Sequence, residues 1–142
     1  MRSLIALAAL SMVAGCANQP LTDAQQAART EWNDRLDEQE RDALAGLTPG
    51  EPVGCIPLNQ ARSTTFIGDR TILYRVSPNL IYRNDPPNGC PGLRPGMTIV
   101  TRTPSNQLCR GEIVRVVDLV AGIEAGGCGL GDFVPYRRGS AD

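Results

Sequence analysis

The residues of this chain that could do chemistry are carboxylates, arginines and cysteines, because its 142 residues include no histidine. The lack of histidine excludes the commonest metal ligand, the commonest general base and every Ser-His or Cys-His nucleophile pair. All 14 basic residues are arginines, and 15 acids bring the net charge to -1, which excludes a globally basic protein that coats nucleic acid. We therefore expect no metal, no cofactor and no nucleic-acid partner.

Carboxylates are the catalytic groups that remain, since a carboxylate pair held at the right separation in a cleft hydrolyses glycosides. The candidates are Asp69, Asp85, Glu112, Asp118 and Asp132. Asp69 and Asp85 lie in turn sequences, where aspartate is favoured because it hydrogen-bonds to the backbone. We therefore expect no catalytic residue and no enzyme, with a carboxylate-dependent cell-wall hydrolase as the less favoured alternative.

Each of the first five predicted strands carries an arginine. These arginines are Arg62, Arg75, Arg83, Arg102 and Arg115. Alternation along residues 71–76 places Arg75 opposite the expected core face, so several arginines could share one outward face. Guanidinium groups bind phosphate and carboxylate through paired hydrogen bonds, which suits an anionic envelope component or an acidic protein as partner. The alternative, which the absence of lysine favours, is that these arginines provide solubility and protect strand edges.

The N-terminal residues have a pattern that predicts export of the chain. Arg2 precedes the stretch 4–13, which is apolar except for Ser11, and small residues follow, a pattern typical of a secretory signal peptide over residues 1–15. The apolar stretch is shorter than the roughly 20 residues that a membrane-spanning helix needs. We therefore expect the stretch to be removed and no transmembrane helix to remain.

The sequence Val13-Ala14-Gly15-Cys16 resembles the lipobox of bacterial lipoproteins. The resemblance implies that Cys16 is acylated, becomes the mature N-terminus and binds the membrane. The residue after the cysteine is Ala17 and not aspartate, which in such lipoproteins implies anchoring at the periplasmic face of the outer membrane. The alternatives are anchoring in the inner membrane and an ordinary cleaved signal peptide with a stray cysteine.

Four further cysteines, an even number in a chain expected to reach an oxidising compartment, predict two disulfides. They are Cys55, Cys90, Cys109 and Cys128. Three pairings are possible, and the sequence alone does not choose among them. Local pairing closes the least chain, so we favour Cys55 with Cys90 and Cys109 with Cys128. No Cys-x-x-Cys spacing occurs, which argues against a metal or redox site.

The elements that position these residues differ in charge. Residues 17–54 carry three arginines and eight acids, a net of -5, whereas residues 55–142 carry ten arginines and seven acids, a net of +3. A capping box from Thr22 to Gln25 predicts an acidic amphipathic helix over residues 22–46, after a lipid-anchored linker at 16–21. The acidic face of this helix is either a solvated spacer or lies against the basic segment or a partner.

After a Pro/Gly linker at residues 47–54, short β-rich runs alternate with turn sequences. Six strands are expected, at residues 62–67, 71–76, 80–83, 98–103, 112–118 and 132–136. The glycine-rich run 122–131 is interpreted as a loop, with a turn pinned by Cys128. This spacing favours a mainly β fold: a disulfide-stapled β-sandwich or partly open barrel over residues 55–137, followed by a tail at 138–142.

Six short motifs occur in order along the chain: Cys55-Ile56-Pro57-Leu58, Arg62-Ser63-Thr64, Tyr82-Arg83-Asn84, Cys90-Pro91-Gly92-Leu93, Gln107-Leu108-Cys109 and Cys128-Gly129-Leu130-Gly131. With the lipobox, they resemble a family of small proteobacterial envelope lipoproteins of unknown function. The resemblance implies export and disulfides, and no activity. We therefore expect a non-enzymatic, outer-membrane-anchored binding or envelope-accessory module. An inhibitor of a lysozyme or protease is the alternative binding function.

Overall fold

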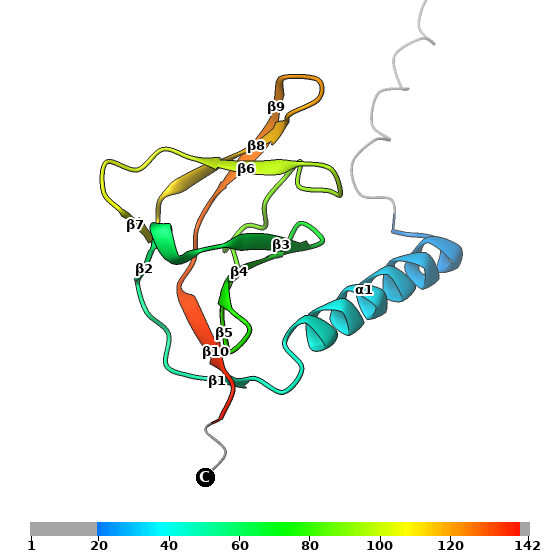
Figure 1. Cartoon of the computed structure of the whole chain (residues 1–142). Coiled ribbons are helices and arrows are strands. Elements are labelled where there is room, and N and C mark those ends of the chain that lie inside the picture. The colour runs from blue at the N-terminus through cyan, green and yellow to red at the C-terminus, as the bar shows by residue number, and fades with distance from the viewer. Residues whose placement is uncertain (1–19, 140–142) are drawn as a thin grey trace, which may run out of the picture. The chain divides into compact units, whose positions relative to one another are not determined.

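A computed structural model describes residues 20–139 of the chain. Its elements are one helix, α1 (Asp23–Ala43), a short 3-10 helix at Leu58–Gln60, and ten strands (Figure 1). The strands are β1 (Thr48–Pro49), β2 (Cys55–Pro57), β3 (Ser63–Ile67), β4 (Thr71–Ser77), β5 (Leu80–Asn84), β6 (Thr98–Thr101), β7 (Gln107–Cys109), β8 (Ile113–Asp118), β9 (Ile123–Gly129) and β10 (Phe133–Arg137). The predicted mainly β fold with an N-terminal helix is therefore confirmed.

The predicted capping box starts α1. The Thr22 hydroxyl accepts a hydrogen bond from the Gln25 backbone N–H at 3.3 Å, and the Gln25 side-chain oxygen accepts one from the Thr22 N–H at 2.9 Å. Two of the donors that every helix N-terminus leaves unpaired are thus satisfied. The helix ends at Ala43, three residues before the predicted end. The chain divides into two units within this helix, residues up to Asn33 and residues from Asp34 onward.

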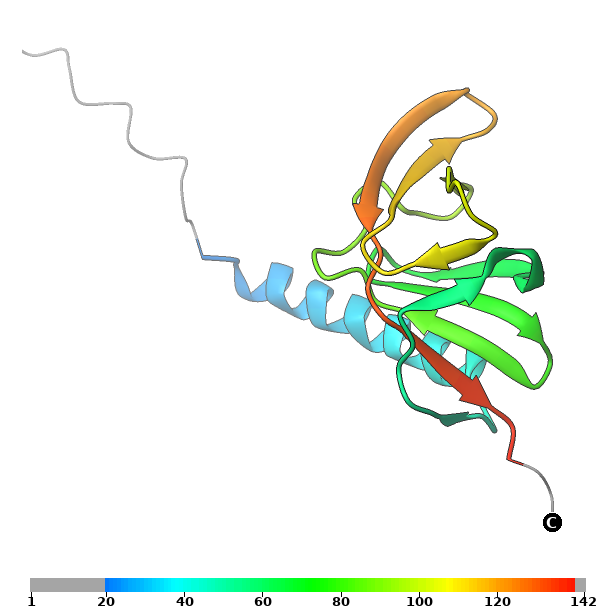
Figure 2. The ribbon, with the colours of Figure 1, turned by 90° about the vertical axis from the view of Figure 1, so that its left-hand side faces the viewer.

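The strands of the second unit form three antiparallel sheets. The largest has the order β1-β10-β5-β4-β3, the second pairs β2 with β7, and the third has the order β6-β8-β9 (Figure 2). All six predicted strands are present, and the described residues form no closed barrel. The predicted linker at 47–54 contributes β1 and a bridge between Val53 and Phe133, so the β-domain begins at Thr48 rather than at residue 55.

The five-stranded sheet is buried on both faces, as β4 illustrates. Ile72 and Tyr74 face a core shared with the other two sheets, where Tyr74 packs against Phe133 with ring centroids 5.8 Å apart. Burial raises the pKa of the Tyr74 hydroxyl. Leu73 faces the opposite way, toward a second core that includes Leu36 of α1. The C-terminal part of α1 therefore covers one face of the sheet.

Leu36 reaches the sheet because the turn between β3 and β4 has no side chain in its way. Gly68 has a φ of +59°, and a Cβ at this position would lie 2.7 Å from a Leu36 methyl carbon. Glycine therefore serves here both for its backbone conformation and for the close approach of the helix. Leu36 is 4% exposed, whereas Trp32 of the same helix is 50% exposed.

The predicted presence of two disulfides is confirmed, but the favoured pairing is wrong. Cys55 is bonded to Cys109, and Cys90 is bonded to Cys128. The first bond forms because β2 and β7 pair antiparallel with these two residues directly opposite each other. Strand pairing between distant segments thus outweighs the preference for closing a short loop.

The interpretation of residues 122–131 as a loop is also wrong, because most of this run is β9. Its glycines allow a close approach of backbone segments: a Cβ on Gly126 would collide with the Pro91 carbonyl, and one on Gly92 with the Ala125 carbonyl. The turn at residues 91–92 therefore lies directly against β9 and brings Cys90 to Cys128. Glycine in a strand interior typically marks such an approach.

The predicted signal peptide at 1–15 and Cys16 lie outside the described residues, as do most of the linker at 16–21 and the end of the tail at 138–142.

Candidate functional site

The five arginines of the predicted anion-binding face do not share one face. Arg75 and Arg83 lie on the α1-facing side of the five-stranded sheet, since Leu73 is the register partner of Arg83. Arg62 precedes β3, whereas Arg102 follows β6 and Arg115 lies on β8 in a different sheet. Strand alternation and the division into three sheets separate them, which the sequence pattern of one arginine per strand does not show.

Two of the five arginines form ion pairs within the chain. Arg83 Nη1 lies 2.9 Å from a Glu40 carboxylate oxygen and Arg83 Nε lies 3.0 Å from Asp85, while Arg115 Nη1 lies 3.0 Å from Glu124. Burial would lower the pKa of Arg83, but a hydrogen bond to the Tyr136 hydroxyl and the charges of Asp85 and Glu40 raise it above its ordinary value. Arg83 is therefore a fixed cation that is engaged internally.

A charged groove of about 730 Å³ separates the C-terminal part of α1 from the loop after β5. Arg83 lines it together with Arg70, which forms an ion pair with Asp37 of the helix. Asp37 and Glu40 thus hold the helix to the sheet. For these two residues the structure shows the second of the two alternatives, in which the acidic helix face lies against the basic segment rather than acting only as a solvated spacer.

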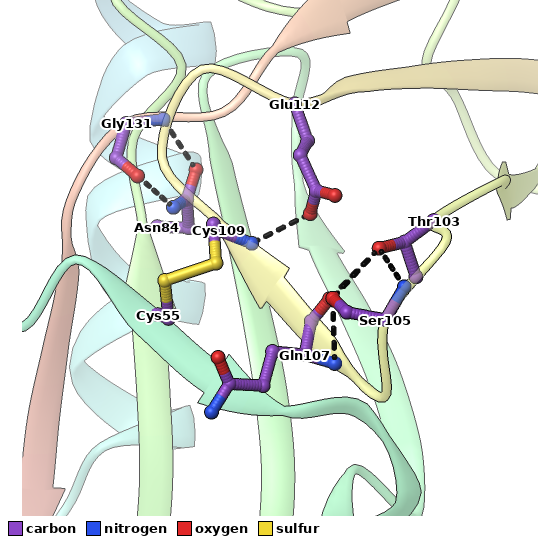
Figure 3. Close-up of a disulfide and its surroundings, with 8 residues drawn as sticks. All are labelled: Cys55, Asn84, Thr103, Ser105, Gln107, Cys109, Glu112 and Gly131. Carbon is purple, nitrogen blue, oxygen red and sulfur yellow. Dashed lines mark hydrogen bonds between the residues drawn. A yellow bond between two sulfur atoms is a disulfide. The ribbon is translucent and has the colours of Figure 1, made fainter.

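Four of the five candidate catalytic carboxylates have structural contacts. Glu112 accepts a hydrogen bond from the Cys109 N–H at 2.6 Å (Figure 3), and Asp132 pairs with Arg110 at 2.9 Å. Asp85 accepts a hydrogen bond from the buried Thr71 hydroxyl at 2.7 Å in addition to its pair with Arg83. Their oxygens cap a strand, join segments and fix a buried hydroxyl.

Asp118, the fourth, orders the tip of the β8–β9 hairpin. One carboxylate oxygen of Asp118 accepts hydrogen bonds from the N–H groups of Val120 and Ala121 at 2.9 and 3.0 Å. For Asp69 the described contact is made by the backbone, whose carbonyl accepts a hydrogen bond from the Cys90 N–H at 2.6 Å. A turn role through side-chain hydrogen bonds to the backbone is thus described for Asp118, whereas the described side-chain contacts of Asp85 are with Thr71 and Arg83.

Sequence reasoning missed the most buried polar side chain of the sheet, Asn84. Its amide nitrogen donates to the carbonyls of Gly131 and Asp132 at 2.8 and 3.2 Å, and its oxygen accepts from the Gly131 N–H at 3.1 Å (Figure 3). Asn84 is fully buried and joins the end of β5 to the segment between β9 and β10. The motif Tyr82-Arg83-Asn84 contains this residue but does not indicate its contacts.

The β8–β9 hairpin carries four of the seven large hydrophobic side chains that are exposed among residues 20–139. Its connection, Leu119-Val120-Ala121-Gly122, and the first residue of β9, Ile123, carry no charge. Val120 is 98% exposed, Leu119 69% and Ile123 57%. In both views the tip lies at the end of the molecule's three-stranded sheet that points away from the five-stranded sheet (Figures 1 and 2). Contiguous exposed apolar side chains of this kind are typical of interaction sites.

A hollow of about 470 Å³ lies at the base of the same hairpin, beside the Cys90–Cys128 disulfide. Four glycines line it, and Pro87, Pro91, Ile113 and Leu130 are among its other lining residues. No group of His, Cys, Asp or Glu side chains within residues 20–139 is arranged to hold a metal ion. Over the same residues, no helix is both long and apolar enough to cross a bilayer.

Comparisons of this chain with protein families, with curated proteins and with solved structures found no match. The resemblance to envelope lipoproteins therefore stays a prediction that rests on the lipobox and on the cysteine-centred motifs of the sequence.

Proposed function

We propose that this protein is an outer-membrane-anchored lipoprotein that faces the periplasm, and that its β-domain is a non-enzymatic binding or envelope-accessory module. The observation that carries the proposal is the pairing of the cysteines. Cys55 with Cys109 and Cys90 with Cys128 account for four of the five, so Cys16, at the end of the apolar N-terminal stretch, is left over. An odd cysteine in that position is the residue that lipoproteins acylate.

The disulfides support the compartment in this proposal. Such bonds persist in secreted proteins and in the periplasm and are rare in the cytosol, where thiols are kept reduced. A lipid anchor of several acyl chains would be effectively permanent, since each buried methylene contributes about 0.8 kcal/mol and two chains already suffice for stable anchoring.

The contacts of the carboxylates support binding rather than hydrolysis. Asp85, Glu112 and Asp132 each join segments of the fold through hydrogen bonds or ion pairs. The exposed apolar tip of the β8–β9 hairpin supports a contact with another molecule.

Metabolic labelling with an alkynyl fatty acid tests the anchor. The wild-type chain is expected to take up the label and to fractionate with the outer membrane, whereas a Cys16→Ala variant takes up none. A Cys55→Ala, Cys109→Ala double variant is the matched control, because it removes cysteines without touching the lipobox. Label that persists in Cys16→Ala, or a wild-type chain that takes up none, would refute the proposal.

A further inference from the structure

The β8–β9 hairpin holds an unusual share of the exposed apolar side chains. Among the described residues, seven large hydrophobic side chains are exposed, and Ile113, Leu119, Val120 and Ile123 of this hairpin are four of them. Three of these four gather at one end, in the charge-free stretch between Asp118 and Glu124. Ile113 lies at the opposite end of β8.

The backbone of this tip is already satisfied by internal hydrogen bonds. The Val120 and Ala121 N–H groups donate to the Asp118 carboxylate, and the Gly122 N–H donates to the Asp118 carbonyl at 2.8 Å. Three successive donors therefore need no water. Moving unpaired backbone N–H groups into an apolar medium costs several kcal/mol each, so a tip with paired donors enters such a medium far more easily.

The composition of the tip favours lipid over protein as the contacting surface. Leu119, Val120 and Ile123 are aliphatic, whereas protein interfaces gain most of their affinity from Trp, Tyr and Arg anchors. The nearest ion pair, Arg115 with Glu124, is neutral overall and lies below the tip. The tip thus presents aliphatic carbon with no free donor among residues 120–122, and the charge nearest to it is the Asp118 carboxylate at its base, which accepts hydrogen bonds from the Val120 and Ala121 N–H groups.

We propose that residues 119–123, the tip of the β8–β9 hairpin, insert into the hydrocarbon edge of a lipid bilayer. This inference rests on the proposed function, because the bilayer it concerns is the one that would hold the acyl chains of Cys16. Asp34 lies 18 positions after Cys16, and residues 23–34 of this stretch belong to α1, so the stretch spans less than the roughly 60 Å of a fully extended chain. A domain confined this close to a bilayer meets it at high effective concentration, so even a small apolar tip is enough to insert.

Tryptophan fluorescence of the acylated protein in vesicles tests the insertion. The chain has one tryptophan, so Trp32→Phe provides a background in which Val120→Trp reports on the tip. Ile113→Trp in the same background is the matched control, since Ile113 is 66% exposed on the same hairpin but far from its tip. The vesicles contain phosphatidylethanolamine and phosphatidylglycerol, with or without bromine atoms on the acyl chains.

The expected result is that the tryptophan at position 120 is shifted to shorter wavelength and loses most of its emission to brominated lipid, whereas the one at position 113 is unaffected. Equal quenching at both positions, or none at either, would overturn the insertion. Photo-crosslinking from position 120 in cells that captures a protein instead of lipid would overturn it as well. If the protein fails to stay on the vesicles at all, the anchor at Cys16 is refuted instead, so the two failures are distinguishable.

Discussion

Replacement of Asn84 by alanine should destabilise the β-domain strongly without touching any surface. The side chain is fully buried and makes three hydrogen bonds, two to carbonyls and one to an N–H, that tie β5 to the segment before β10. Gly131 is closely packed, since a Cβ at this position would lie 2.4 Å from the Asp85 carbonyl oxygen. Alanine therefore leaves the Gly131 N–H and two carbonyls without partners.

The expected loss is about 3 kcal/mol, at roughly 1 kcal/mol for each of the three hydrogen bonds. The total free energy of unfolding of a small domain is about 5–15 kcal/mol. In urea the unfolding midpoint should fall by roughly 1 to 3 M, given the m-values of small proteins. Asn79→Ala is the matched control, because Asn79 is exposed and its described hydrogen bonds are made by its backbone, so its midpoint should not move.

A charged replacement adds a pH test of the same contact. In Asn84→Asp, one carboxylate oxygen replaces the amide nitrogen and faces the carbonyls of Gly131 and Asp132. Folding then favours the protonated carboxyl, so the folded state binds the proton more tightly and stability falls as pH rises from 4 to 7. If Asn84→Ala and Asn79→Ala shift the midpoint equally, or if Asn84→Asp is as stable at pH 7 as at pH 4, the assigned hydrogen bonds are wrong.

Three further perturbations test the packing. Replacing Cys90 and Cys128 by alanine opens a loop of 38 residues. In the chain-entropy model the free energy of unfolding, measured in urea, should fall by about 4 kcal/mol. An unchanged unfolding midpoint would contradict the disulfide. Leu36→Ala should cost about 2–5 kcal/mol, because Leu36 lies in the core between α1 and the sheet, and a loss below that range would mean that the helix does not pack there. Gly126→Ala should lower the thermal midpoint much more than Gly129→Ala. A Cβ on Gly126 collides with the Pro91 carbonyl, whereas one on Gly129 meets an Ile113 methyl at 3.6 Å. Equal midpoints for the two variants would refute the close approach of the turn to β9.

The local elements were predictable from the sequence because their causes are local. Thr22 and Gln25 form a capping box three residues apart, and α1 starts there. Alternating apolar residues in 71–76 follow the pleat of β4, and turn residues such as Gly68 and Asn79 separate the predicted strands. In each case the residues that interact are a few positions apart.

The disulfide pairing and β9 were not predictable in this way because they depend on distant segments. Cys55 meets Cys109 through the pairing of two three-residue strands that have no strong pattern of their own. The glycines of β9 are typical of a loop, and their reason, the turn at 91–92 lying against the strand, appears only in three dimensions. Counting cysteines predicts how many bonds form but not which residues they join.

The candidate interaction surfaces also depend on how distant segments pack, and the sequence pattern does not show this. One arginine per strand suggests a shared face, but Arg75 and Arg115 lie in different sheets, and Arg115 is paired with Glu124. The sequence pattern does not indicate an exposed tip at Leu119 and Val120, because two aliphatic residues next to a strand are typical of a continuation of that strand. Their exposure depends on the turn that Asp118 caps.

Intact-mass spectrometry of the protein extracted from cell envelopes tests the central claim most directly, since one mass reports the N-terminus, the acylation and the disulfides. The account predicts a chain that begins at Cys16, carries the mass of its acyl groups and is four hydrogens lighter than its reduced form because of the two disulfides. A chain that begins at Cys16 without added mass, or that retains Met1, would contradict the lipid anchor. Four free thiols at Cys55, Cys90, Cys109 and Cys128 would contradict the stapled β-domain and its oxidising compartment.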